Sequence, residues 1–286
     1  ATSFVIATQA AAPKSPDPRV IVELIADAPQ IVTPTGIGVD DRGRVLVIES
    51  HTHFRPKEYK GPERDRVLMF EIGPNTKAKR TIFYEGLLMG MDLAISKDGW
   101  VYLAERSRIL RARDTNNDGK ADKVENVIVM KTTGVYPHNG LSGLCFDAHG
   151  NLYFGIGENL GHPYTMIDRG GIKIEGKRGI GGGVFRCRLN GKRLEQVARE
   201  RQLVLCVGMS EKEKDLIYNC QVLIGPQGYI GKSRKIHMSE DEGLMYVGGS
   251  AIPVFDIGKC KVGSVICYDA FYPEITRTLA LKGAEV

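Results

Sequence analysis

A hairpin-like pattern recurs three times in the first 200 residues, and it constrains the fold more than any other feature. It occupies residues 36–50, 92–106 and 143–157, where two runs of alternating apolar residues flank a polar pair and a glycine. Alternation with period two places apolar side chains on one face of a strand, and glycine supplies the positive φ of a tight turn. The repeat therefore predicts antiparallel β-hairpins.

A hairpin repeat about every 50 residues is typical of β-propeller blades. Further strand-like segments lie between the hairpins at residues 66–72, 108–113, 126–131 and 182–189. Residues 26–198 supply about three blades and part of another, whereas closure needs at least about four. We therefore expect a flexible lead-in over residues 1–25 and then a partial propeller; the alternative is an irregular β-sandwich.

The composition excludes several classes of protein. Hydrophobic residues make up 42% of the chain and charged residues 26%, which is ordinary for a globular protein and excludes disorder throughout. There is no run of 18 apolar residues, so we expect no transmembrane segment. The net charge of +5 is small for 286 residues, and we expect no nucleic-acid partner. None of the six cysteines forms a C-x-x-C pair, which argues against a zinc ribbon or a haem-attachment site.

An acidic loop, DTNNDGKADKVE, interrupts the strand pattern at residues 114–125. It matches a twelve-residue calcium loop, with oxygen ligands at positions 1, 3, 5, 7, 9 and 12 and glycine at position 6. The predicted ligands are Asp114, Asn116, Asp118, the carbonyl of Lys120, Asp122 and Glu125. Strand-like segments flank the loop, so the pattern predicts a structural Ca²⁺ site in a β-hairpin; the alternative is a solvated turn that binds no metal.

Residues 20–198 resemble planctomycete-type membrane-bound dehydrogenases, which are similar to the glucose/sorbosone dehydrogenase propellers. The segments VIESHTHFRP, GMDLAISKDGWVYLAE, RARDTNNDGKADKVE and YPHNGLSGLCFDAHGNLYFGIGENLG carry the resemblance. It implies an exported or periplasmic protein, a sugar-type substrate and pyrroloquinoline quinone as cofactor. It also implies His138 as a base for hydride removal, and the alternative is a loop histidine with a local hydrogen bond. His51 and His53 have the H-x-H spacing of metal ligands, or they mark the polar end of a strand.

The pattern changes at about residue 198. Strand-like runs occupy residues 203–208 and 215–225, and a later run ends at Cys267. The last residues have helical spacing from Pro273, so strands followed by a helix predict an α/β layer. A cysteine between a strand and a helix N-terminus is either a buried structural residue or a thiol with a lowered pKa.

From about residue 198 to residue 286, in the domain expected at 199–286, the chain resembles the nitrilase superfamily of carbon–nitrogen hydrolases through IGKSRKIHM, GG-x-x-x-PVFD and VGSVICYDAFYPEITRTLALKGAEV. The resemblance implies part of an α-β-β-α sandwich, a cytoplasmic location, a homo-oligomer and an amide or nitrile substrate. It implies Cys267 as the nucleophile, Lys235 as the cation that stabilises the oxyanion, and Glu242 as a supporting carboxylate. The family's catalytic glutamate precedes the lysine, and no segment before residue 200 resembles its motif. We expect Glu211 to be structural.

The sequence therefore predicts a mixed multi-domain chain, a fusion or chimera of a partial all-β propeller and a partial α/β segment that meet near residues 198–202. The expected function is hydrolysis of non-peptide C–N bonds, impaired because the catalytic glutamate segment is absent. The alternatives are a calcium-containing, quinoprotein-like sugar dehydrogenase and a non-catalytic binding propeller.

Overall fold

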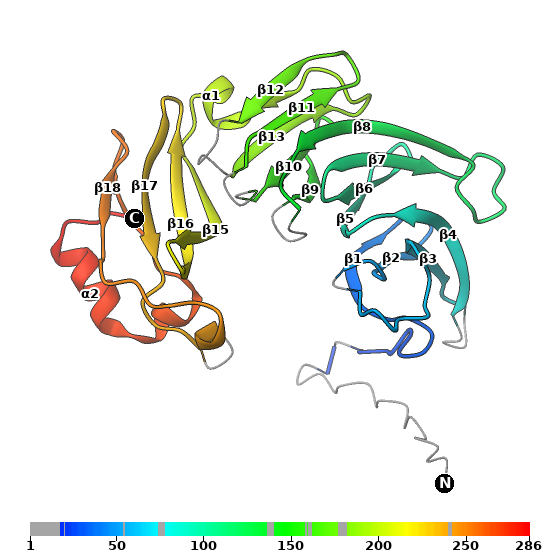
Figure 1. Cartoon of the computed structure of the whole chain (residues 1–286), viewed down its shortest axis with the longest axis horizontal. Coiled ribbons are helices and arrows are strands. Elements are labelled where there is room, and N and C mark those ends of the chain that lie inside the picture. Colours follow the sequence, from blue (N-terminus) through cyan, green and yellow to red (C-terminus); the bar gives the residue numbers. More distant parts are fainter. Residues whose placement is uncertain are drawn as a thin grey trace, which may run out of the picture. The chain divides into compact units, whose positions relative to one another are not determined.

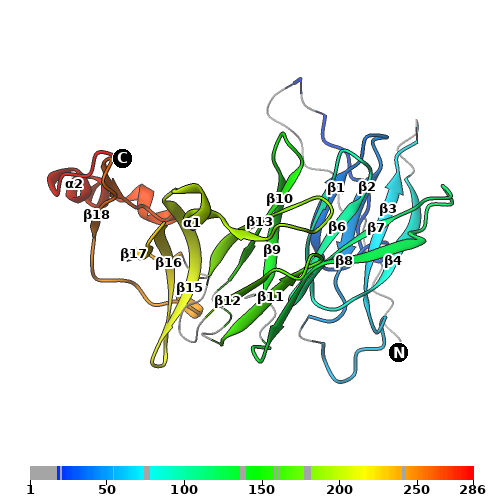
Figure 2. The same ribbon diagram turned by 90° about the horizontal axis from the view of Figure 1, so that it is seen from above.

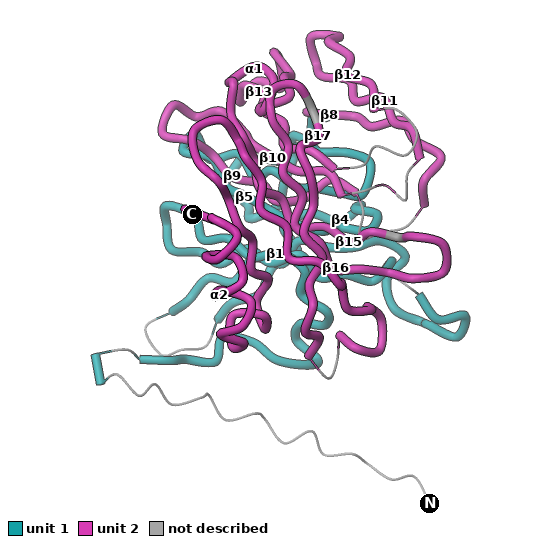
Figure 3. Tube along the Cα trace, turned by 90° about the vertical axis from the view of Figure 1, so that its left-hand side faces the viewer, with its two compact units in different colours: residues 1–126 teal, residues 127–286 magenta. Residues whose placement is uncertain are grey.

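The computed structural model describes residues 18–19, 21–53, 55–73, 78–135, 140–157, 159, 162–176, 182–239 and 242–286. The chain divides into two compact units, residues 1–126 and residues 127–286 (Figure 3). Strands dominate both units (Figure 1). Among the described residues, no helix is long and apolar enough to span a membrane.

The first unit begins with a four-stranded antiparallel sheet in the order β1-β2-β3-β4. Its strands are β1 (Pro34–Val39), β2 (Val45–Glu49), β3 (Asp65–Glu71) and β4 (Lys79–Leu87). Next come β5 (Gly90–Ile95), β6 (Val101–Glu105) and β7 (Arg108–Arg113), which also pair antiparallel. The hairpins β1–β2 and β5–β6 confirm two copies of the predicted repeat, and their turns contain Gly43 and Gly99 at φ of 74° and 81°.

Both faces of the first sheet are covered by apolar side chains. The run VLVIE in β2 is buried at every position, which the period-two pleat explains if each face has its own core. Two clusters of buried residues supply these cores. One contains Leu46, Ile48, Val67 and Met69, and the other contains Val45, Val47, Leu68 and Phe70.

In the second unit, two groups of paired strands come before the C-terminal region. Strand β8 (Lys123–Thr132), which begins in the first unit, pairs with β11 (Tyr164–Asp168), and β11 pairs with β12 (Lys173–Gly176). A second sheet has the order β14-β13-β10-β9. Its strands are β9 (Leu141–Phe146), β10 (Asn151–Ile156), β13 (Gly183–Arg188) and β14 (Glu195–Gln196). The hairpin β9–β10 is the third predicted copy.

The C-terminal region combines strands with short helices (Figures 1 and 2). Helix α1 (Val197–Arg201) leads into an antiparallel meander, β15 (Leu205–Glu213), β16 (Leu216–Gly225) and β17 (Gly228–Arg234). The small hairpin of β18 (Val254–Asp256) and β19 (Lys261–Gly263) follows. Helix α2 (Pro273–Leu281) begins at the predicted proline.

The strand predicted to end at Cys267 is shorter than expected. Strand β19 ends at Gly263, and Cys267–Phe271 forms a 3₁₀ turn. Side-chain bonds to other elements hold this segment in place of a β-ladder: the Ser264 hydroxyl donates to the Gln221 side chain, and Asp269 binds the chain after β17.

Candidate active site around Lys235 and Cys267

Lys235 lies directly after β17 with its side chain buried, only 1% exposed. Its backbone is fixed on both sides, because its N–H donates to the Asn219 carbonyl (2.8 Å) and its carbonyl accepts from Gly249 N–H (2.7 Å). A buried ammonium needs a countercharge. The Glu242 carboxylate provides it by ion pairing with Lys235 Nζ.

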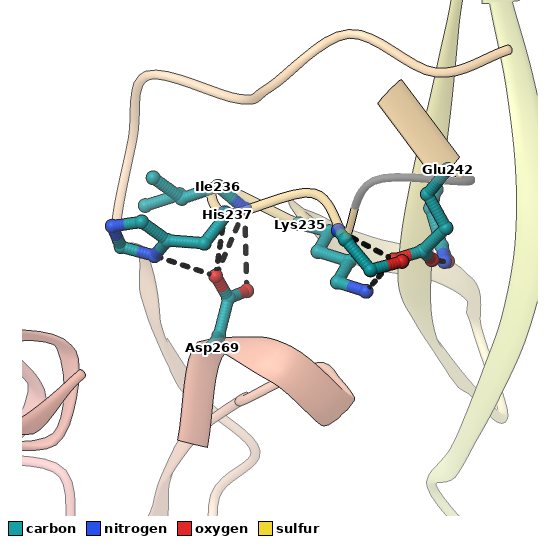
Figure 4. Close-up of polar contacts among 7 residues, drawn as sticks. Lys235, Ile236, His237, Glu242 and Asp269 are labelled. Atoms are coloured by element: carbon teal, nitrogen blue, oxygen red, sulfur yellow. Dashed lines mark hydrogen bonds and ion pairs between the residues drawn. The ribbon is translucent and has the colours of Figure 1, made fainter. Parts of the chain in front are cut away.

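Glu242 opens a short 3₁₀ turn, Glu242–Leu244, and its carboxylate accepts several hydrogen bonds (Figure 4). The donors are Lys235 Nζ, Asn219 Nδ2 (3.0 Å), Ser239 Oγ (2.9 Å) and Ser239 N–H (3.2 Å). The hydrogen bond from the ammonium of Lys235 is the main cause that lowers the pKa of Glu242 to about 2. The structure thus brings two predicted site residues together as a charged pair at neutral pH.

Cys267 is exposed and is the first residue of the 3₁₀ turn. Its φ of 47° lies in the left-handed region, which is strained for a residue with a β-carbon. Such strain often marks functional positions. The alternative of a buried structural thiol does not hold for Cys267.

The other cysteines offer a contrast. Burial raises the pKa of Cys187 to about 12, and burial together with a hydrogen bond to Glu211 does the same for Cys220. Cys206 is exposed, yet partial burial of its thiol raises the pKa. A pKa of about 12 keeps the thiols of Cys187 and Cys220 protonated at neutral pH.

Asp269 is a site residue that the sequence analysis missed. It is 3% exposed, and its Oδ1 accepts from the backbone N–H (2.7 Å) and lies 2.9 Å from the ring Nδ1 of His237 (Figure 4). Ile236 N–H also donates to the carboxylate, at 3.2 Å to Oδ2. The His237 ring stacks on Tyr272 with centroids 3.5 Å apart and planes 7° apart. The sequence contains one hint of this pairing. His237 follows Lys235 by two residues, and Asp269 follows Cys267 by the same two residues.

Glu211 takes part in an ion-pair network on the meander. It pairs with Lys232 and with Arg234 Nε (2.8 Å). Burial acts to raise the pKa of Glu211, but hydrogen bonds from Arg234 and Lys232 outweigh it and hold the pKa at about 2. These contacts agree with the expected structural role.

The histidine candidates lie in the earlier part of the chain. His138 lies outside the described residues. His51 is buried, with Nε2 2.9 Å from Glu49 Oε2 and Nδ1 2.5 Å from Tyr59 Oη. A carboxylate can only accept, so Nε2–H donates to Glu49, while Nδ1 and the Tyr59 phenol share a second hydrogen bond. Both ring nitrogens are thus engaged, which favours a polar strand end over metal ligation for His51.

Side chains of the acidic loop accept hydrogen bonds from backbone N–H groups of the same loop. Asp114 accepts from Asn117 N–H (2.6 Å) and Gly119 N–H (2.9 Å), and Asp122 accepts from Thr115 N–H (2.9 Å). Similar bonds join Asn116 to Asp118 N–H and Asp118 to Lys120 N–H. No group of three or more His, Cys, Asp or Glu side chains among the described residues is arranged to hold a metal ion.

Glu125, at position 12 of the loop, does not fit a calcium site in this conformation. Its carboxylate pairs with the guanidinium of Arg111 at 2.6 Å. The same guanidinium stacks over Trp100, 4.2 Å from the ring centroid. Calcium binding by this loop stays a prediction, and it requires Glu125 to leave Arg111.

Comparison with known proteins supports the expected family for the C-terminal region. Residues 191–286 match the family described as carbon-nitrogen hydrolase. Over these residues the chain is similar to carbon–nitrogen hydrolases. A nitrilase of Pyrococcus abyssi is 48% identical over 94 residues, which cover 32% of this chain and 36% of that protein. An (R)-stereoselective amidase of a Pseudomonas species is 34% identical over 93 residues, 32% of this chain and 34% of that protein.

The hydrolase domain spans about a third of the length of these curated relatives. Its match begins at residue 191, within the second compact unit and before the boundary expected at residue 199. Among solved structures, virginiamycin B lyase from Staphylococcus aureus aligns over 84% of this chain and 86% of its own, with 14% identity. The TM-score of 0.34 is too low to assign a common fold.

Proposed function

We propose that the hydrolase domain cleaves a non-peptide carbon–nitrogen bond of a small amide or nitrile, with Cys267 as the nucleophile. The observation that carries this proposal is the exposed, left-handed Cys267 in a segment matched to nitrilases and amidases. The buried pair of Lys235 and Glu242 adds a fixed cation from the same domain.

The chemistry follows from these groups. The Cys267 thiolate attacks the amide carbon, and a C–S bond forms while negative charge develops on oxygen. The ammonium of Lys235 is proposed to stabilise this charge. The C–N bond then breaks, nitrogen leaves with a proton as ammonia or an amine, and water hydrolyses the thioester to the acid and the free thiol. With a nitrile the first adduct is a thioimidate.

We also propose that turnover by this chain is slow. A positioned general base contributes about 10²–10⁴-fold to rate. No segment before residue 200 resembles the glutamate motif that supplies this base in the family. Glu242 does not replace it, because a carboxylate whose pKa is held at about 2 is a weak base.

Cys267 is expected to be the fastest-alkylated thiol of the protein at pH 7. Intact-mass spectrometry after iodoacetamide treatment, with peptide mapping, measures the rate at each cysteine. Cys206 is the matched control, since it is also exposed but has a raised pKa. Cys267→Ala should remove the fast phase and any amide or nitrile hydrolysis. Equal rates at Cys267 and Cys206 would contradict the nucleophile assignment.

For the preceding region we propose a partial propeller whose acidic loop binds Ca²⁺. The support is the three hairpins and the twelve-position ligand pattern. The quinoprotein dehydrogenase alternative rests on sequence resemblance. Its candidate base, His138, lies outside the described residues.

Calcium is expected to raise the melting temperature of the protein. A ligand that binds only the folded state adds about 2.7 kcal/mol at a hundredfold excess over Kd. Calorimetric scans with Ca²⁺ and with a chelator measure the difference, and Glu125→Gln should remove it. Identical scans of the parent protein would show that the loop is a metal-free turn.

A further inference from the structure

Two short motifs in the hydrolase domain mirror each other. Lys235 is followed two residues later by His237, and Cys267 is followed two residues later by Asp269. The second members of the two motifs meet directly, through the Asp269 carboxylate and both the backbone N–H and the ring Nδ1 of His237 (Figure 4). The segment that carries the cation is therefore joined to the segment that carries the thiol.

We propose that Asp269 is a positioning residue that fixes Lys235 relative to Cys267 by clamping the Ile236–His237 segment onto the 3₁₀ turn. The inference rests on the proposed function, because it gives Asp269 a role only if Lys235 acts on the chemistry at Cys267. Asp269 itself does not react.

The contacts of Asp269 favour this role over a general packing role. Its carboxylate is buried, and its three donors, Ile236 N–H, His237 N–H and His237 Nδ1, all come from the segment after Lys235. Charge-assisted hydrogen bonds of this kind are the strong ones. Stacking of His237 on Tyr272 adds a second attachment to the same segment.

Both the side chain of Lys235 and the backbone that follows it are therefore bound. Glu242 binds its ammonium, and Asp269 binds the backbone one and two residues later. An asparagine at position 269 would keep one acceptor oxygen but lose the charge and the second acceptor. The Lys235 segment would then gain freedom relative to Cys267. We then expect Lys235 to act less effectively on the chemistry at Cys267.

The test is the pH profile of Cys267 alkylation, which follows the thiolate. Lys235→Gln should slow alkylation at pH 7, because it removes the cation that the proposed function sets against the reacting thiolate. Asp269→Asn should slow it in the same direction, and the double variant should be no slower than Lys235→Gln alone. Asp269→Glu should recover part of the rate. Asp256→Asn, the same change at an exposed aspartate, should have no effect.

The titratable groups of the segments that meet here could also shape the profile. They are Lys235, His237, Glu242, Tyr246, Tyr268, Asp269 and Tyr272. The comparison of single and double variants separates an effect of Asp269 that acts through Lys235 from effects that act through the other groups. Only the effect through Lys235 disappears when Lys235 is already replaced by glutamine.

The outcomes distinguish the role of Lys235 toward Cys267 from the positioning role of Asp269. If Lys235→Gln leaves the profile unchanged, the proposed role of Lys235 toward Cys267 fails. If Lys235→Gln slows alkylation and Asp269→Asn does not, or if their effects add, the positioning role fails while the proposed function stands. Should Asp269→Asn not fold, His237→Phe removes the ring bond to Asp269. It should slow alkylation about twofold to threefold, and an unchanged rate would overturn the proposal.

Discussion

Replacing Glu242 by glutamine should destabilise the second unit by about 3 kcal/mol, at the lower end of the ~3–5 kcal/mol expected when a buried ion pair loses one partner. The reason is that the Lys235 side chain is 1% exposed, so water cannot replace the lost countercharge. The partial exposure of Glu242, 25%, keeps the value at the lower end. Urea denaturation followed by circular dichroism measures the change.

The matched control is Lys235→Met. It should cost less, because the remaining carboxylate is partly hydrated and keeps its bonds from Asn219 and Ser239. The double variant should be more stable than the sum of the single losses predicts. Equal losses from the two single variants would contradict the asymmetry of burial.

The Glu242 pair also sets a pH dependence. The folded-state pKa of Glu242, about 2, is below its ordinary value of 4.5, so the pair contributes its full stability above about pH 4.5. This contribution is lost as the pH falls through about 2. Glu242→Gln should therefore remove part of the acid sensitivity, and an unchanged acid transition would contradict the assignment.

The second large effect is expected in the first unit. Asp65→Ala should destabilise it by about 4 kcal/mol or more. The fully buried Asp65 carboxylate accepts from His51 N–H (2.5 Å), Thr52 N–H (2.7 Å) and Gly90 N–H (2.8 Å). Each buried donor left unsatisfied costs about 1–3 kcal/mol.

Asp41→Ala serves as the comparison, since Asp41 is exposed and should change stability by less than about 0.5 kcal/mol. Calorimetry of both variants gives the difference. A loss below about 1 kcal/mol for Asp65→Ala would show that water or a shifted loop satisfies the three amides.

The sequence predicted what depends on local pattern. Period-two alternation and turn glycines located the three hairpins, and a proline located the start of α2. Motifs identified Lys235, Glu242 and Cys267, of which the first two form an ion pair.

The features that the sequence analysis did not predict depend on contacts between residues of different elements. The ion pair of Glu125 with Arg111 links side chains of the adjacent strands β7 and β8, and the linear calcium-loop pattern does not include Arg111. The early end of β19 follows from bonds to residues of other elements. The hydrogen bond between His237 and Asp269 joins residues more than 30 positions apart, so the shared two-residue offset in K-x-H and C-x-D hints at the pairing but does not establish it.

The stacking of Arg111 on Trp100 gives the protein a built-in optical reporter. Trp100 is the single tryptophan of the chain, so its fluorescence arises from one site. The guanidinium that covers its ring also binds Glu125. A change in the Glu125–Arg111 pair would alter the surroundings of the indole, so tryptophan emission can report on this end of the acidic loop without an attached dye.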